Sequence, residues 1–223
     1  MLTCLFLSQD FLPKLKRHLL PRVMSALRDH RDALSVAIDG DPNAVLFKHD
    51  RIYQHKLIRI NYTTYDVRRS QDVANASTTH CNVMTLADPS EHDSVSSHPF
   101  KYARILGVYH VNVVYTGPGM LDYQPRKLEF LWVRWYRTLK TTRHAGWGGR
   151  KLDRLQFVPW GEDDAFGFLD PSDVLRSCHI IPAFATGKRY VDRKGLSFVA
   201  HDSNDWTAYY VNRCVAMTVD NTD

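Results

Sequence analysis

Two long segments of alternating side chains constrain this chain more than any other feature. Residues 101–115 and 127–137 are rich in Val, Leu, Tyr and Trp, a composition and a period of two that are typical of β-strands. Both faces of the second segment carry large apolar side chains, which indicates a strand that is covered on both sides. We expect the two segments to pair as an antiparallel unit inside a barrel or sandwich, with a bend or bulge at Gly107.

Shorter strand patterns surround this unit. We expect strands at 82–86, 153–158 and 178–182, a short final element at 206–211, and a hairpin in which 45–47 and 51–53 flank 48–50. Residues 55–67 predict a longer strand, with Ile58, Ile60 and Tyr62 on one face and Leu57, Arg59 and Asn61 on the other. Most of 68–97 is polar and is expected to be loop. Residues 170–173 predict a short helix capped by Asp170 or Ser172.

The N-terminal part has a different period. Phe11, Leu15, Leu19, Val23 and Leu27 recur at helical spacing, and the prolines at 13 and 21 predict short helices that begin near each of them. The basic residues between them form either the solvated side of an amphipathic helix or a phosphate-binding face. We expect a mainly β (α+β) fold: a helical N-terminal appendage and linker at 1–43, a small antiparallel β-barrel at 44–212, and an irregular tail at 213–223.

Composition excludes several classes of protein. The chain has 223 residues, of which 44% are hydrophobic and 12% aromatic, which favours a folded globular protein over a disordered one. No run of about 18 apolar residues occurs, and the N-terminus lacks the features of a secretory signal, so we expect an intracellular protein. The four cysteines are scattered and predict reduced thiols, although a zinc site that uses the His80–Cys81 and Cys178–His179 neighbours remains an alternative.

No catalytic motif is recognisable. The sequence has no nucleophile elbow and no phosphate-binding loop, and its acidic clusters at 162–164 and 170–173 lack the spacing of a calcium loop. We therefore expect a protein that is not an enzyme and that needs no cofactor or metal.

One charged segment is more specific. Residues 126–154 contain nine Lys and Arg against two acids, interleaved with Trp132, Trp135, Tyr136 and Trp147. Such a stretch suits phosphate contacts with stacking, or recognition of a methylammonium group by aromatic rings. The alternative is a strand that supplies aromatic residues to a core and arginines to its rim. The candidate nucleic-acid-binding residues are Arg143, His144, Trp147, Arg150 and Lys151.

Four segments resemble a family of uncharacterised proteins that are abundant as repeats in mushroom-forming fungi and associated with transposable elements. These segments are residues 59–69, 98–107, 130–135 and 165–171, the last running into 180–184. Residues 213–223 depart from the family's pattern, as the end of a truncated or frame-shifted gene would. The resemblance implies a transposon-derived gene, and it leaves open a decayed fragment without function.

A second resemblance is to the bromo-adjacent homology module, a β-barrel of chromatin proteins that often binds histone tails or nucleosomes. Its strand motifs are similar to 102–105, 133–137 and 178–181, and its acidic turn to 170–173, in the same order. The resemblance implies a nuclear, non-enzymatic module that binds chromatin or another protein. It makes Trp135 and Tyr136 candidate walls of a peptide-binding surface, with Tyr62, Tyr65 and Trp160 as neighbours.

Two functions therefore compete at this point. The first is the interaction module, with a histone tail, a nucleosome or another protein as its partner. The second is an accessory DNA-binding domain of a transposon-encoded protein that uses the basic segment 126–154 and the basic N-terminal helix. An enzyme with an unfamiliar site is a third hypothesis.

Overall fold

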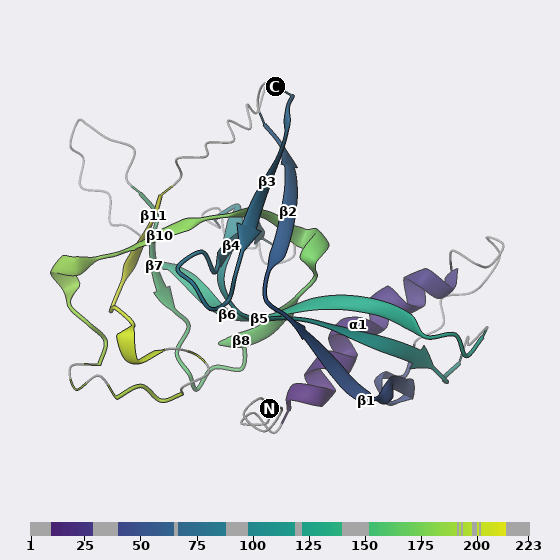
Figure 1. The fold of residues 1–223 in the computed structure, drawn as a ribbon. Coiled ribbons are helices and arrows are strands. Elements are labelled where there is room, and N and C mark those ends of the chain that lie inside the picture. Colours follow the sequence, from purple (N-terminus) through teal and green to yellow (C-terminus); the bar gives the residue numbers. More distant parts are fainter. Residues whose placement is uncertain are drawn as a thin grey trace.

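The protein is mainly β, with one α-helix in the described part of the chain (Figure 1). The computed structural model describes residues 10–28, 40–64, 67–87, 98–118, 122–139, 152–190, 192, 194–197, 200 and 202–212. Its elements are α1 (Phe11–Arg28), β1 (Val45–His55), β2 (Ile58–Thr63), β3 (Arg69–Ala74), β4 (Asn82–Leu86), β5 (Phe100–Tyr115), β6 (Arg126–Leu139), β7 (Arg154–Phe157), β8 (Phe166–Leu169), β9 (Val174–Ser177), β10 (His179–Pro182) and β11 (Tyr209–Asn212). Short 3-10 helices cover Pro42–Ala44, Pro171–Asp173, Phe184–Thr186 and Asp202–Asn204.

The long strands β5 and β6 form the centre of the larger sheet, as the sequence predicts. They pair antiparallel from Tyr102↔Tyr136 to Val113↔Arg126, with a register shift between Ile105 and Gly107. The predicted bulge is therefore confirmed, and a Cβ atom at Gly107 would overlap the ring of Tyr109. Because both strands are long, each has different partners along its length. One half of β5 pairs with β4 and the other half with β1, while β6 pairs with β7 and with β8.

The larger sheet curls, but the closed barrel expected at 44–212 is not found among the described residues. Its order is β10-β11-β7-β6-β5-β4-β9, and within the described residues no ladder joins β9 to β10. These two end strands are consecutive in the chain, however, since only Cys178 separates them. The two ends of the sheet are thus linked covalently through one residue, and the ring that results encloses Tyr102, Tyr136, Phe157 and Tyr209.

Helix α1 is one continuous element and not the two short helices expected at the prolines. Pro21 lies inside it, where it removes a backbone donor and costs about 3 kcal/mol relative to alanine. Burial offsets this cost, because the apolar stripe predicted from the sequence is 0–4% exposed and packs against Val45, Tyr109 and Phe130 of the sheet. Tertiary packing therefore outweighs the local signal of the proline, and helix and sheet share this core.

Residues 45–53 form a single strand and not a hairpin. Both ends of β1 pair with β5, residues 45–47 with 113–115 and residues 52–55 with 108–111, with a register shift between Phe47 and Ile52. His49 and Asp50 have φ angles of 60° and 50°, so the residues that resemble a turn make a bulge. The strand continues because β5 offers a partner edge on both sides of the irregularity. The bulge and its charged side chains also make this free edge a poor template for another strand.

A separate two-stranded sheet holds β2 and β3, which form a ribbon that rises from the larger sheet (Figure 1). The strand expected at 55–67 is limited to Ile58–Thr63, and β3 lies within the segment expected to be mostly loop. The expected strand at 82–86 is confirmed as β4. Strands β8 and β9 have no counterpart among the predicted strands. The predicted short helix is confirmed as a 3-10 helix, with Asp170 accepting a hydrogen bond of 2.9 Å from the backbone N–H of Ser172.

Candidate interaction site

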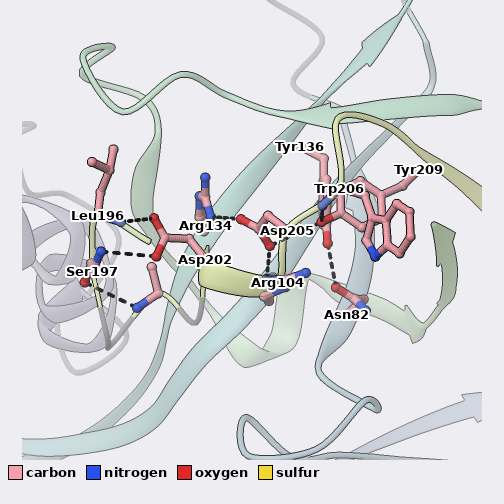
Figure 2. A network of polar contacts seen from close by, with 11 residues as sticks. Asn82, Arg104, Arg134, Tyr136, Leu196, Ser197, Asp202, Asp205, Trp206 and Tyr209 are labelled. Atoms are coloured by element: carbon pink, nitrogen blue, oxygen red, sulfur yellow. Dashed lines mark hydrogen bonds and ion pairs between the residues drawn. The ribbon is translucent and has the colours of Figure 1, made fainter. Parts of the chain in front are cut away.

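Two arginines face each other inside the curled sheet. Arg104 of β5 lies directly opposite Arg134 of β6, and like charges in such a cross-strand pair repel. Asp205 bridges them, with Oδ1 2.8 Å from Nη1 of Arg104 and Oδ2 2.6 Å from Nη1 of Arg134 (Figure 2). The side chains of Arg134 and Asp205 are 0% and 1% exposed. The carboxylate is therefore the group that allows two guanidinium groups to occupy this interior.

Aromatic rings complete the surroundings of the two guanidinium groups. The guanidinium carbons of Arg134 and Arg104 lie 3.9 Å and 4.4 Å from the ring centre of Phe157. Nε and Nη2 of Arg134 are buried without a hydrogen-bond partner, and the electron-rich face of Phe157 partly compensates for this. Tyr136 stacks on Phe157 with 4.1 Å between ring centres, and its hydroxyl donates a hydrogen bond of 3.0 Å to Oδ1 of Asn82.

The segment that carries Asp205 is held by further polar contacts. The hydroxyl of Tyr209 donates to Oδ1 of Asp205 at 3.2 Å and accepts from the backbone N–H of Trp206 at 2.8 Å. Burial raises the pKa of Tyr209 to about 12, and the Asp205 carboxylate acts in the same direction. Asp202 accepts backbone N–H bonds from Leu196 and Ser197 at 2.8 Å and 3.1 Å (Figure 2).

We call Arg104, Arg134, Asp205 and Tyr209 the clasp. Burial opposes the charge on Arg104, but the nearby Tyr136 and Asp205 raise the pKa of this guanidinium, which stays protonated. Because Arg134 and Asp205 are closed to solvent, a substrate cannot reach them. The chemistry of the clasp is mutual neutralisation, which fastens the segment before β11 to the two central strands.

A groove of about 330 Å³ lies at the surface near the same ends of β5 and β6, where Lys101 and residues 135–138 line it within a few positions of Arg104 and Arg134. Its walls come from β5, β6 and the turn after β7. They include Phe100, Trp135 and Val158 and three charged residues, Lys101, Arg137 and Asp164. This volume is at the lower end of the range for ligand sites. An apolar floor with charges at the rim suits one side chain of a partner better than a large metabolite.

The charges around the groove differ in how they are engaged. Arg137 pairs with Glu162, which raises the pKa of the guanidinium. His98 lies 2.8 Å from Asp153 through Nε2 and Oδ2. Asp164 is exposed and makes no hydrogen bond or ion pair with the described residues, although its charge also helps to raise the pKa of Arg137. Of these rim groups, Asp164 is therefore the one whose charge is most available to a partner.

The indole of Trp135 is fixed by its neighbours. A Cβ atom added to Gly167 of β8 would lie 2.7 Å from Nε1 of Trp135, so glycine is the residue that lets the indole lie against this strand. The backbone N–H of Trp135 donates to the carbonyl oxygen of Ala165 at 3.0 Å. This bond places the acidic turn that ends at Asp164 beside the tryptophan.

The groove brings together two of the five candidate aromatic residues, Trp135 and Tyr136. They are neighbours on β6, and the ring of Tyr136 is turned inwards, where the side chain is only 6% exposed. Tyr62 lies elsewhere, with its ring centre 3.3 Å from the guanidinium carbon of Arg176. Trp160 packs against Phe166 at 4.7 Å between ring centres. Tyr65 lies outside the described residues.

The basic segment 126–154 is partly neutralised within the fold. Each of the four basic residues of β6 has a carboxylate partner: Arg126 with Asp122, Lys127 with Glu129, Arg134 with Asp205, and Arg137 with Glu162. The candidate residues Arg143, His144, Trp147, Arg150 and Lys151 lie outside the described residues. Their nucleic-acid role stays a prediction.

Sequence reasoning missed the clasp. A signal for half of it exists, because alternation places Arg134 on the same face of its strand as Leu128, Phe130 and Trp132. A charge on such a face needs a partner. The partner, Asp205, is 71 positions further along the chain, and no local pattern distinguishes it from the other acids.

Comparison with protein-family models finds no match, and comparisons with curated proteins and with solved structures also find none. Within the described part of the chain, three or more His, Cys, Asp or Glu side chains do not gather in a way that could hold a metal ion. In the same part, no helix has the length and apolar character needed to cross a membrane.

Proposed function

We propose that this chain is a non-enzymatic interaction module that binds a basic segment of a partner protein, such as a histone tail, in the groove beside Trp135. The observation that supports this proposal is the combination of a fixed indole with the exposed, unpaired carboxylate of Asp164 in one groove. In this proposal the module works in the nucleus and derives from a transposon-encoded gene.

The chemistry of binding follows from the groove. A lysine or arginine side chain of the partner enters the groove lined by Phe100 and Trp135 and brings its charge close to the indole. A cation over an indole is stabilised by about 0.5–2 kcal/mol, depending on desolvation. Asp164 adds an ion pair at the rim, and Glu162 holds Arg137, which would otherwise repel the ligand.

Calorimetric titration with synthetic histone-tail peptides tests the proposal. We expect Asp164→Asn to weaken binding about 5-fold, which corresponds to about 1 kcal/mol for a partly exposed ion pair. Asp163→Asn is the matched control, because Asp163 is an exposed acid in the same turn that does not line the groove. Equal affinities of the two variants, or the absence of binding to any basic peptide, would contradict the proposal.

A further inference from the structure

The β2–β3 ribbon presents one face that the rest of the protein does not use. In its register Arg59 lies opposite Val73, Asn61 opposite Gln71, and Thr63 opposite Arg69. All six side chains are exposed, whereas the alternate positions are buried or half-buried. We call this set the outer face of the ribbon.

The opposite face fastens the ribbon to the body of the protein. Ile60 and Ala74 are 5% and 0% exposed and belong to a core cluster with Val83 and Val174. Asp72 accepts a hydrogen bond of 2.8 Å from Nε of Arg176. These contacts fix the ribbon on the body of the protein, so the side chains of its outer face have defined relative positions.

The outer face combines cations with amides. Arg59 and Arg69 stand at opposite ends, four residue steps or about 13 Å apart along the strands. Between them Nε2 of Gln71 donates a hydrogen bond of 2.8 Å to Oδ1 of Asn61. The one carboxylate in β2 and β3, Asp72, lies on the other face and is bound to Arg176. The outer face is therefore positively charged and free of carboxylates.

We propose that this outer face docks into the major groove of double-stranded DNA. That groove is about 12 Å wide and admits a two-stranded ribbon. The spacing of Arg59 and Arg69 lets each reach a different phosphate, while the amides of Asn61 and Gln71 lie where base edges are read. Asn and Gln side chains form hydrogen bonds with adenine in this groove. An acidic peptide has no adenine, so the two amides favour DNA as the ligand. The inference uses residues outside the Trp135 groove and does not depend on the proposed peptide binding.

Fluorescence anisotropy with a labelled 24-bp DNA duplex, at 50–200 mM KCl, tests the inference. We expect the double variant Arg59→Ala/Arg69→Ala to bind at least 10-fold more weakly at 100 mM KCl. The slope of log K against log salt should become about 2 units less steep, because each lost phosphate contact contributes about 0.9. Arg189→Ala/Lys194→Ala removes the same charge from exposed sites outside the ribbon and should change the affinity less than 2-fold.

Two further experiments test the role of the amide side chains and the preference for DNA over RNA. Asn61→Ala/Gln71→Ala should narrow the spread of affinities across a panel of DNA sequences and leave the salt slope unchanged. An RNA duplex of the same sequence should bind at least 10-fold more weakly, since its major groove is too deep and narrow for a ribbon. Asp164→Asn should leave DNA binding unchanged. The peptide proposal and the DNA inference can therefore fail independently of each other.

Three results would overturn the inference. The first is DNA affinity that the ribbon variants reduce no more than the control variants. The second is equal affinity for DNA and RNA duplexes, or displacement of DNA by polyglutamate at matched charge, either of which would indicate a general anion-binding surface. The third is no DNA binding at 50 mM KCl. Circular dichroism and urea unfolding of each variant confirm that it is folded, so that a loss of binding reports on the outer face.

Discussion

At the scale of single residues, the protein places two positive charges opposite each other inside a sheet. Arg104 and Arg134 are tolerated because one carboxylate, Asp205, contacts both. Alternation in the sequence indicates that Arg134 faces inwards, but the identity of its partner depends on how the chain returns 71 positions later. Trp135 could be predicted as a candidate binding residue because it lies on a central strand, within a segment rich in basic and aromatic residues. Asp164 could not, since it is one of three consecutive acids.

Removal of the shared carboxylate should be costly. Asp205→Asn leaves two buried guanidinium groups without a counter-charge, and we expect a loss of about 3–5 kcal/mol in the free energy of unfolding. Urea unfolding followed by circular dichroism measures this loss. Glu162→Gln is the control, because it breaks the more exposed pair with Arg137 and should cost about 0–1 kcal/mol. Similar losses for the two variants would show that the clasp does not hold the fold together.

The clasp also predicts how stability depends on alkaline pH. The pKa of Tyr209 is raised to about 12 in the folded protein, against about 10 in an unfolded chain. Between these values the unfolded state loses a proton that the folded state keeps. The contribution of Tyr209 to the free energy of unfolding is therefore fully present below pH 10 and decreases as the pH rises to 12.

We expect Tyr209→Phe to be less sensitive than the wild type over this range, by up to about 1.4 kcal/mol per pH unit. Urea unfolding at several pH values from 9 to 12 measures the difference between the two proteins. Parallel pH profiles would contradict the assignment of this titration to Tyr209.

At the scale of secondary-structure elements, the predictions succeeded where burial and period agree. Strands β5 and β6 are long, apolar and alternating, so they could be predicted together with their pairing and the bulge at Gly107. Strand β3 has only six residues, and the face that points to solvent is polar. Its sequence therefore resembles that of a loop. Helix α1 shows the opposite conflict, because the local signal of Pro21 is overridden by packing against the sheet.

Replacement of the interior proline should stabilise the helix. Pro21→Ala restores a backbone donor for the carbonyl of Arg17, and we expect a gain of about 1–3 kcal/mol in unfolding free energy. Pro13 lies in the first turn, where a proline is tolerated, so Pro13→Ala should change stability by less than about 1 kcal/mol. Chemical unfolding of the two variants compares them directly. A Pro21→Ala protein that is less stable than the wild type would show that the helix depends on the proline.

At the scale of the whole molecule, two long strands contribute to three core clusters and carry the candidate site on their surface. One part of the sheet packs on α1, and the other curls into a ring whose ends meet through Cys178. The sequence predicted a barrel, whereas within the described residues no ladder joins the two ends of the sheet, and it predicted β10 but not β9. The Trp135 groove and the outer face of the ribbon use different residues, so the two proposals can be tested separately.

The central claim is that the groove beside Trp135 receives a cationic side chain. The most direct measurement is an NMR titration that follows the indole N–H resonances of the five tryptophans while a basic histone-tail peptide is added. We predict that the Trp135 resonance shifts most and saturates, and that Asp164→Asn moves saturation to higher peptide concentration. A Trp135 resonance that stays in place while the peptide binds elsewhere, or does not bind, would contradict the claim.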